Sequence, residues 1–179
     1  MSDQELSKYL SWILRHRPDA VGLVLDDAGW VDIDMLLTAC ATHGRPLGRD
    51  QLEALVRASD KQRFAIDAAG QRIRANQGHS LPIDLQLQPA EPPAELYHGT
   101  VARFLASIRK TGLQRGQRHH VHLAADRATA ERVGARRGDA VILRVAAARM
   151  QADGHRFWRS ANGVWLVDAV PPAYLAEEP

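Results

Sequence analysis

The chain of 179 residues has one cysteine, no long apolar segment and very little lysine. The lone Cys40 excludes a disulfide framework, and its place in the apolar helical stretch MLLTACATHG predicts a buried packing residue. No apolar run approaches the length of a membrane span. The start, MSDQELSKYL, lacks the basic segment and apolar core of a signal peptide. These absences predict a cytoplasmic protein with no membrane partner.

Arginine supplies almost all of the positive charge. Of the 23 basic residues, only Lys8, Lys61 and Lys110 are lysine, and the net charge is +2. Residues 1–88 are slightly acidic and the remainder is basic. Arginine offers a planar, bidentate fork for phosphate. A GC-rich genome or a need for solubility would produce the same bias, so composition alone decides nothing.

Local signals predict three helices and a hairpin in the first 80 residues. Ser2 and Glu5 form a capping-box pattern that begins a helix, and Pro18 ends it near Arg15. We expect further helices at 33–43, with Asp32 as cap and Gly44 as stop, and at 50–58. Strands are expected at 63–67 and 71–75, joined by the turn 68–70. This order is typical of a winged-helix lobe.

A second lobe is expected after a linker. Residues 81–94 hold four of the nine prolines and little helical periodicity. The remainder predicts helices at 101–111 and 126–136 and strands at ELYHGT, VHL, 140–147, FWRS and GVWLVD. Many short strands with few helices indicate an α+β sheet lobe. The predicted fold class is thus α+β, with lobes at 1–80 and 95–179, a linker at 81–94, and a design that indicates a monomer.

Arginine and histidine recur where elements end, without a matching set of acids. Arg15 and His16 end the first helix, Arg63 begins a wing strand, and Arg118 precedes a later strand. Such a site suits an anion, most plausibly phosphate. Two other interpretations stay open at this point. Arg15 and His16 would also suit a helix C-terminus electrostatically, and a wing arginine ordinarily touches nucleic-acid phosphate.

Ordinary major-groove binding is disfavoured by the helix at 50–58. That helix would read the bases, and Asp50, Glu53 and the following Asp60 would repel phosphate. The sequence therefore favours an anion site over a plain duplex reader.

Two histidine motifs have competing interpretations. In RHHVHL, His120 and His122 share a strand face while His119 points away, but no nearby acid or Cys completes a zinc pattern. We therefore predict no metal, and imidazoles that hydrogen-bond a ribose or an amide. In YHGT, Gly99 after His98 lets a flat ligand approach the backbone, or simply forms a turn. No G-x-G-x-x-G is present, so a dinucleotide would not be held in the Rossmann manner.

Taken together, the motifs resemble those of the NAD-dependent RNA (tRNA) 2′-phosphotransferases. LSKYLSWILRH, GWVDIDMLL, KQRF, IRANQGHS, LYHGT, HHVHL and SANGVWL occur in that family's order over residues 5–168. The resemblance implies a winged-helix lobe that binds RNA and phosphate and an ADP-ribosyltransferase-like lobe that binds NAD⁺. Ala124 and Val167 depart from the Ser and Thr expected there, which affects fine contacts and not the reaction.

The implied reaction removes an internal RNA 2′-phosphate, as in tRNA splicing. The phosphate attacks C1″ of the nicotinamide ribose of NAD⁺, giving an ADP-ribosylated RNA intermediate and nicotinamide. The 2″-OH then attacks phosphorus, giving RNA with a free 2′-OH and ADP-ribose 1″,2″-cyclic phosphate. A phosphate monoester is already anionic, so no carboxylate base is needed, and one would repel it.

The resemblance also assigns roles to individual residues. The catalytic set is Arg15, His16, Arg63 and Arg118. The residues expected to hold NAD⁺ are His98, Gly99, Thr100, His122, Ser160, Asn162 and Val164. Because His is the member of the catalytic set that titrates near neutrality, we expect His16 to transfer or orient a proton in the second step. One site built from both lobes is expected.

Two other functions are kept as alternatives. One is an NAD-dependent ADP-ribosyltransferase that stops after the first step and caps terminal phosphates of RNA or DNA. The other is a winged-helix nucleic-acid binder without enzymatic activity. The physiological RNA cannot be read from the chain.

Overall fold

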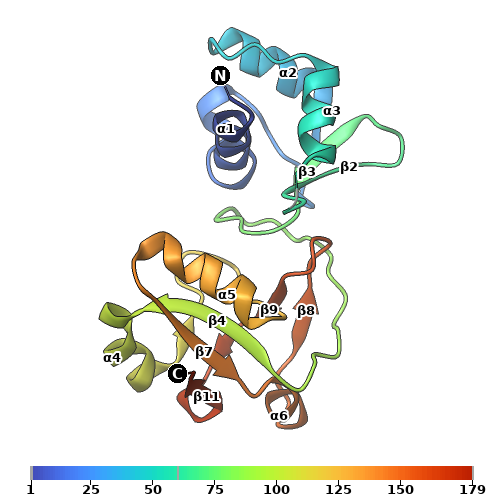
Figure 1. The fold of residues 1–179 in the computed structure, drawn as a ribbon. Coiled ribbons are helices and arrows are strands. Elements are labelled where there is room, and N and C mark those ends of the chain that lie inside the picture. Colours follow the sequence, from blue (N-terminus) through green and yellow to red (C-terminus); the bar gives the residue numbers. More distant parts are fainter. Residues whose placement is uncertain (1, 60, 179) are drawn as a thin grey trace. The chain divides into compact units, whose positions relative to one another are not determined.

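The chain folds into two compact units, Met1–Gln86 and Leu87–Pro179 (Figure 1). The structure is a computed structural model that describes residues 2–59 and 61–178. Helices and small antiparallel sheets make up both units, so the predicted α+β class is confirmed. Each unit contains its own cluster of buried apolar side chains. Asp60, one of the acids expected to repel phosphate, lies outside the described residues.

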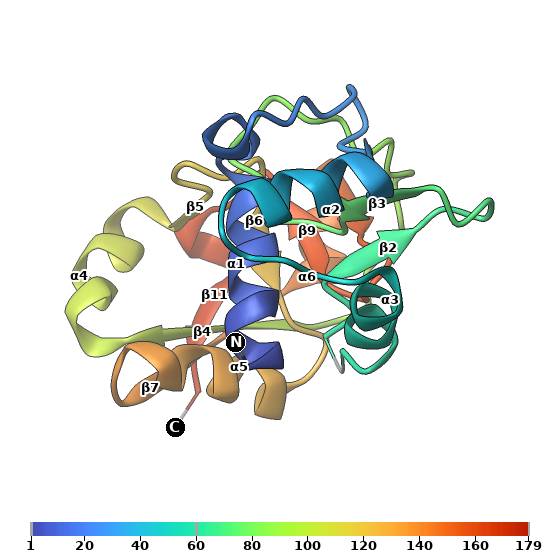
Figure 2. The same ribbon diagram turned by 90° about the horizontal axis from the view of Figure 1, so that it is seen from above.

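The first unit packs helices against a small antiparallel sheet of strand order β1-β3-β2. Its elements are α1 (Asp3–Arg15), β1 (Val31–Asp32), α2 (Ile33–Thr42), α3 (Arg49–Arg57), β2 (Phe64–Ile66) and β3 (Arg72–Ala75). The expected helices and hairpin strands are all confirmed. The sequence missed β1, a two-residue strand that pairs Val31 with Ile73. Seen from above, the β2–β3 hairpin extends outward beyond α3 (Figure 2).

Helix α1 begins and ends where its local sequence predicts. The Ser2 hydroxyl accepts from the Glu5 amide, and the Glu5 carboxylate accepts from the Ser2 amide, which completes the capping box. The helix ends at Arg15, and Pro18 starts a short 3₁₀ turn, Pro18–Val21. The apolar stripe of α1 is buried in the core of the first unit: Leu6, Leu10, Ile13 and Leu14. Burial of this stripe holds the helix in place.

The hairpin owes its register to buried apolar residues and a polar turn. Phe64 and Ile73 point into the core. In the turn, the Asp67 carboxylate accepts the amide and the guanidinium of Arg72, at 3.1 and 3.0 Å. These hydrogen bonds, the guanidinium first, lower the pKa of Asp67. Gly70 occupies the left-handed region at φ +70°, which a turn of this kind favours. A one-residue slip would expose the buried face.

The second unit is built from short antiparallel strands with helices against them. Two three-stranded sheets, β11-β7-β4 and β6-β9-β8, are linked by an isolated bridge between Tyr97 and Ala124, and β5 pairs with β10. The strands are β4 (Leu96–Val101), β5 (Leu113–Gln114), β6 (Val121–Leu123), β7 (Ala140–Val145), β8 (Phe157–Arg159), β9 (Trp165–Val167), β10 (Ala169–Val170) and β11 (Leu175–Glu177). The helices are α4 (Ala102–Thr111), α5 (Arg127–Gly134) and α6 (Ala147–Ala152).

The prediction of one strand over residues 140–147 was wrong at its end. Strand β7 stops at Val145, and α6 starts at Ala147. Alanine is the best helix former, and Ala147 and Met150 lie on one helical face that is fully buried. Period-two alternation cannot be told from a helical start over so few residues, so packing decided this element.

Residues 81–94 contain no helix or strand, and the division between the units falls within them. The carbonyl of Phe157 accepts the Ala90 amide at 2.8 Å, and an isolated bridge joins Pro89 to Trp158. The last stretch of the proline-rich segment is thereby anchored to β8.

Cys40 is buried in the core of the first unit, as predicted. Burial raises the pKa of its thiol, so it stays protonated and unreactive. Among the described helices, none has the length and apolar character needed to cross a membrane.

Candidate functional site

Arg15 and His16 lie at the C-terminal end of α1 and are held there by Ser80. Arg15 is the last helical residue, and its carbonyl accepts the Ser80 amide at 3.0 Å. The His16 ring Nδ1 lies 3.0 Å from the Ser80 hydroxyl. A hydroxyl can donate or accept, so this contact orients the ring without fixing its protonation state. The contact is compatible with either role of His16 in a proton transfer.

Arg63 contacts the same helix from the start of the wing hairpin. It directly precedes β2, and its Nη1 donates to the hydroxyl of Ser7, a buried residue of α1, at 3.2 Å. The structure therefore brings Arg15, His16 and Arg63 to one helix. Ser7, which contacts Arg63, precedes Arg15 by about 12 Å along the axis of α1. Long side chains on a helix lean toward its N-terminus, which for Arg15 is the direction of Ser7.

The backbone beside Arg63 is held by Asn76. This side chain is only 5% exposed, and its Nδ2 donates to the Gln62 carbonyl at 2.6 Å. The Asn76 amide donates to the Arg63 carbonyl at 2.9 Å. Gln62 has φ +37°, a strained conformation for a residue other than glycine. The two hydrogen bonds of Asn76 stabilise this strained backbone and so help to orient the Arg63 side chain.

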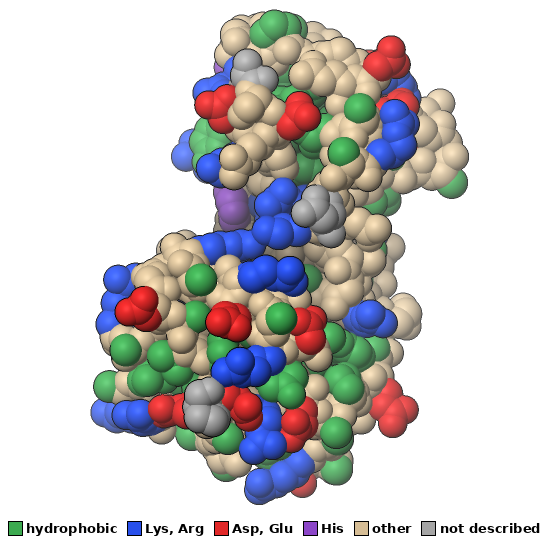
Figure 3. All heavy atoms as spheres, viewed as in Figure 1, with side chains coloured by type: hydrophobic (Ala, Val, Ile, Leu, Met, Phe, Trp, Pro, Cys, Tyr) green, Lys and Arg blue, Asp and Glu red, His purple; other side chains and the backbone are tan. Residues whose placement is uncertain are grey.

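Candidate arginines and surface arginines have different partners. Many surface arginines pair with carboxylates, as Arg109 does with Glu177 at 2.7 Å and Arg144 with Glu95 at 2.6 Å. Figure 3 shows such acidic and basic side chains interspersed on the second unit. Within the described residues, Arg63 and Arg118 form no such pair, and their hydrogen-bond partners are neutral: Ser7 and His122. Their charge remains available to an anion.

In the second unit, His98 is held as a neutral ring of defined tautomer. It lies on β4, on the same face as the buried Leu96. Its Nδ1 is 3.0 Å from the carbonyl of His122, and a carbonyl only accepts, so Nδ1 holds the proton. Burial lowers the pKa of His98, the bond to His122 opposes this, and the charges of Arg137 and Arg118 lower it further. Neutral His98 therefore presents an acceptor at Nε2.

His122 has the opposite tautomer. Arg118 Nη1 lies 3.1 Å from its Nδ1, and a guanidinium only donates, so Nδ1 accepts and Nε2 holds the proton. A doubly protonated ring could not accept this bond. The second unit thus joins Arg118, His122 and His98 in one chain of contacts, which presents a ring donor, a ring acceptor and a cation.

Sequence reasoning missed Arg137, which belongs to the 3₁₀ turn after α5. Its charge lowers the pKa of both His98 and Arg118, after the larger effect of burial in each case. A basic residue in a predicted surface helix end gives no local signal of this proximity. Only the packing of α5 on β4 and β7 brings Arg137 near them.

Gly99 and Thr100 have structural explanations that sequence did not reveal. A Cβ on Gly99 would collide with the carbonyl oxygen of Ala130 in α5. That helix, and not a ligand, occupies the open face of this glycine, which corrects the physical reason given for it. Gly134 lies against the same stretch of β4. Thr100 is 5% exposed, so its hydroxyl belongs to the interior of the unit.

Ser160, Asn162 and Val164 shape the turn between β8 and β9. The Ser160 hydroxyl accepts the Val164 amide at 3.1 Å and lies 2.6 Å from the Asn162 side-chain oxygen. Gly163 takes φ +79° in this turn. Ser160 is 4% exposed, so its visible role is to fix the turn.

Of the other histidines of RHHVHL, His120 has an aromatic and an acidic neighbour. His120 lies against Trp158, with 4.9 Å between ring centroids, and 3.9 Å from Asp168. Over residues 2–59 and 61–178, no three His, Cys, Asp or Glu side chains gather as metal ligands would.

The acids of α3 repel phosphate less than expected. Glu53 lies 3.2 Å from Arg49 and 3.5 Å from Arg57, which offset its charge. Among the described acids of α3, the charge argument against duplex binding therefore now rests on Asp50.

Comparison with known proteins gives a consistent result. A family profile described as "RNA 2'-phosphotransferase, Tpt1 / KptA family" matches residues 1–169. A "Probable RNA 2'-phosphotransferase" of Nostoc punctiforme is 56% identical over 178 residues, covering 98% of each chain. Proteins of the same name from Streptomyces griseus and Pseudomonas aeruginosa are 54% and 53% identical. These cover 96% and 97% of this chain and 94% and 96% of their own lengths.

Proposed function

The chain belongs to the RNA 2′-phosphotransferase family, and we propose that it transfers an internal RNA 2′-phosphate to NAD⁺. Family membership makes it an enzyme that acts on RNA. The proposed products are RNA with a free 2′-OH, nicotinamide and ADP-ribose 1″,2″-cyclic phosphate. The observation that supports this most is the set of arginines whose hydrogen-bond partners are neutral.

We propose a separate role for each unit. The order α1-β1-α2-α3-β2-β3, with the projecting hairpin, supports a winged-helix lobe that binds RNA phosphate. The small antiparallel sheets of the second unit, with α5 against β4 and β7, support an ADP-ribosyltransferase-like lobe that binds NAD⁺. Residues 81–94 act as the linker.

In the first step, the RNA 2′-phosphate is the nucleophile. An oxygen of the phosphate bonds to C1″ of the nicotinamide ribose while the bond from C1″ to the nicotinamide nitrogen breaks. The phosphate monoester is anionic near neutral pH, so no side chain has to deprotonate it. The residues proposed to bind phosphate and spread its charge are Arg15 and Arg63 in the first unit and Arg118 in the second.

The candidate NAD⁺ residues suit a neutral ligand surface. Neutral His98 offers an acceptor and neutral His122 a donor, as a ribose hydroxyl and a carboxamide require. Gly99, Thr100, Ser160, Asn162 and Val164 complete the proposed set by shaping its surroundings: Gly99 lets α5 pack on β4, Thr100 is buried, and Ser160 fixes the turn that contains Asn162 and Val164. No carboxylate belongs to this set, which agrees with an anionic nucleophile that needs none.

In the second step, a proton must move. The 2″-OH loses its proton as it attacks phosphorus, and the RNA 2′-oxygen leaves and gains one. His16 is assigned this transfer because an imidazole can both donate and accept a proton near neutral pH, and its contact with Ser80 is compatible with either role. His98 and His122 lack this freedom, since each has a tautomer fixed by its partner.

The test uses NAD⁺ and a short RNA with one internal 2′-phosphate. Release of nicotinamide with formation of ADP-ribose 1″,2″-cyclic phosphate is the expected result. A stable ADP-ribosylated RNA would show that the enzyme stops after the first step, and terminal-phosphate substrates would then be examined. Binding without nicotinamide release would contradict the proposal.

A further inference from the structure

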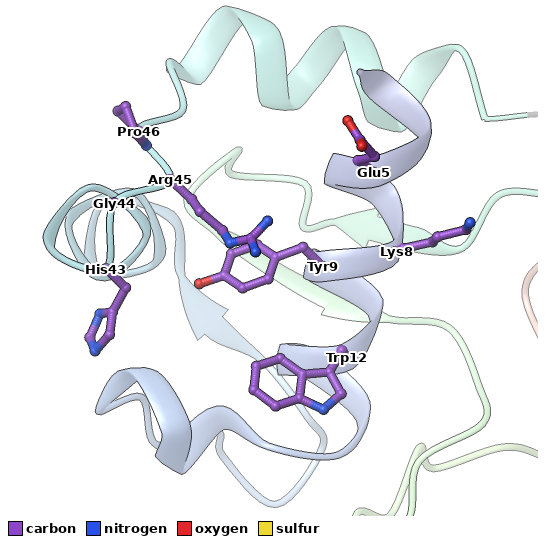
Figure 4. A pocket seen from close by; sticks show the side chains of 8 residues that line it. All are labelled: Glu5, Lys8, Tyr9, Trp12, His43, Gly44, Arg45 and Pro46. Atoms are coloured by element: carbon purple, nitrogen blue, oxygen red, sulfur yellow. The ribbon is translucent and has the colours of Figure 1, made fainter. Parts of the chain in front are cut away.

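An open groove follows one side of α1 in the first unit. Its volume is about 1030 Å³, and its walls come from α1 and from the segment between α2 and α3 (Figure 4). The side chains that define its character are Lys8, Tyr9, Trp12, His43 and Arg45. None of them belongs to the catalytic or NAD⁺ sets described above.

Two aromatic rings line this groove. Trp12 is 42% exposed, although it lies in the middle of a helix. The Tyr9 ring lies 6.2 Å from it, with 29° between the ring planes, so the two present nearly parallel faces. Exposed aromatic faces are the platforms on which single-stranded bases stack.

Positive charge lies beside these rings. The Arg45 guanidinium is 4.4 Å above the centroid of Tyr9, a cation–π contact that steadies it. Figure 4 shows it directly against the Tyr9 ring. Lys8 adds a second cation on α1. Arginine stacked on an aromatic ring is a recurrent device for holding a nucleotide phosphate.

One acid also lines the groove, and it is engaged by the helix start. The Glu5 carboxylate accepts the Ser2 amide at 2.8 Å and the Ser2 hydroxyl at 3.1 Å. These bonds lower the pKa of Glu5, with a smaller effect from Arg45. Lys8 and Arg45 outnumber it among the lining residues, so the groove has an excess of positive charge that favours an anion.

The groove leads toward the proposed catalytic end of α1. Trp12 precedes His16 by four residues, so the two are neighbours on the helix surface, separated by about 6 Å along the axis. A strand whose 2′-phosphate reaches His16 can therefore continue over Trp12.

We propose that this groove binds the RNA strand next to the 2′-phosphorylated nucleotide, with a base stacked on Trp12 and a backbone phosphate at Arg45. The assignment rests on the proposed function, because RNA must be the substrate. A strand with both bases and phosphates suits a groove that has an exposed aromatic ring at Trp12 and a cation at Arg45. A peptide would need a wider apolar surface than Tyr9, Trp12 and Pro46 provide.

The test measures binding of a labelled hexaribonucleotide with one internal 2′-phosphate by fluorescence anisotropy, without NAD⁺. Trp12→Ala is expected to raise the Kd about 5- to 150-fold, the range for loss of one stacked base. Trp12→Phe should retain most of the affinity. Arg45→Ala should lower the slope of log K against log salt by about one. The affinity for adenosine 2′-phosphate, which needs only the phosphate-binding residues, should stay unchanged.

A matched control lies on α4, where Arg103 lies 5.0 Å from the ring of Phe104. Phe104→Ala removes an exposed aromatic of the same kind and should leave the Kd unchanged. An unchanged Kd in Trp12→Ala, or an equal rise in Phe104→Ala, would overturn the groove assignment. Because NAD⁺ is absent, a failure of the transfer reaction would appear separately, as RNA binding without nicotinamide release in the turnover assay.

Discussion

At the residue scale, hydrogen-bond partners separate side chains of the same type. His98 and His122 each meet a group with only one possible role, a carbonyl and a guanidinium, so each ring has one tautomer. His16 meets a hydroxyl, which can play either role. The same distinction separates arginines that pair with carboxylates from those that contact neutral groups. Residue type alone would assign all of them one chemistry.

Replacing Arg63 or Arg118 by Ala is expected to cripple turnover while leaving the fold intact. Each change removes a charge-assisted contact to phosphate, worth roughly 1.5–3 kcal/mol, or about 10- to 150-fold in rate. Nicotinamide release under saturating NAD⁺ measures the effect, and circular dichroism checks the fold. Arg57→Ala, at a surface arginine paired with Glu53, is the control and should turn over normally. Full activity in both test variants would refute the assignment.

His16→Ala is expected to accumulate the ADP-ribosylated RNA intermediate. The first step needs no proton transfer, whereas the second needs one at the 2″-OH and one at the leaving 2′-oxygen. Single-turnover assays with RNA labelled near the 2′-phosphate would separate the two steps on a gel. Collapse of the first step with a fast second step would show that the role given to His16 is wrong.

At the scale of elements, the segment after β3 holds the candidate residues of the first unit. Asn76 holds the backbone at Gln62 and Arg63, and Ser80 holds Arg15 and His16. Neither residue needs to touch the substrate to matter. Secondary structure places the helix and the hairpin, and this irregular segment ties one to the other.

Asn76→Ala is expected to lower both stability and turnover. Losing its hydrogen bond to the Gln62 carbonyl costs about 0.5–1.5 kcal/mol and frees Gln62 from its strained conformation. A thermal melt measures stability, and a double-mutant cycle with Arg63→Ala measures the coupling. If Asn76 acts through Arg63, the two losses of turnover will not add. Strict additivity would show that Asn76 serves stability alone.

At the scale of the whole molecule, the chain consists of two units with separate cores. Every member of the first buried cluster lies between Leu6 and Ala75, and every member of the second between Leu96 and Val170. Each unit is of a size that can bury its own core. This arrangement allows one unit to specialise in RNA and the other in NAD⁺, as proposed.

A fragment of residues 1–86 is therefore expected to fold by itself. Among residues 2–59 and 61–178, the members of its buried cluster all lie in the first unit, so its unfolding should stay cooperative. Urea denaturation followed by circular dichroism and by tryptophan fluorescence should give coincident transitions. A fragment without a cooperative transition would show that the first unit needs contacts from the rest of the chain.

Much of the fold could be predicted because its signals are local. The capping box of Ser2 and Glu5, the stop at Pro18 and the turn at Gly70 each lie within a few residues of the structure they cause. The strand β1 and the helix α6 were not predictable in this way. Val31 becomes a strand only because Ile73 pairs with it, and Ala147 becomes helical because its face is buried.

The sequence by itself determined the element order, the α+β class and the residues worth suspecting, because caps, breakers and motifs act over short stretches of chain. Only the tertiary structure decided what those residues meet. It placed α5 over Gly99, brought Arg137 near His98, set the two opposite histidine tautomers and joined Asn76 to the backbone of Gln62 and Arg63. These depend on contacts between residues far apart in sequence, and no local pattern encodes which neutral or charged partner a side chain will find.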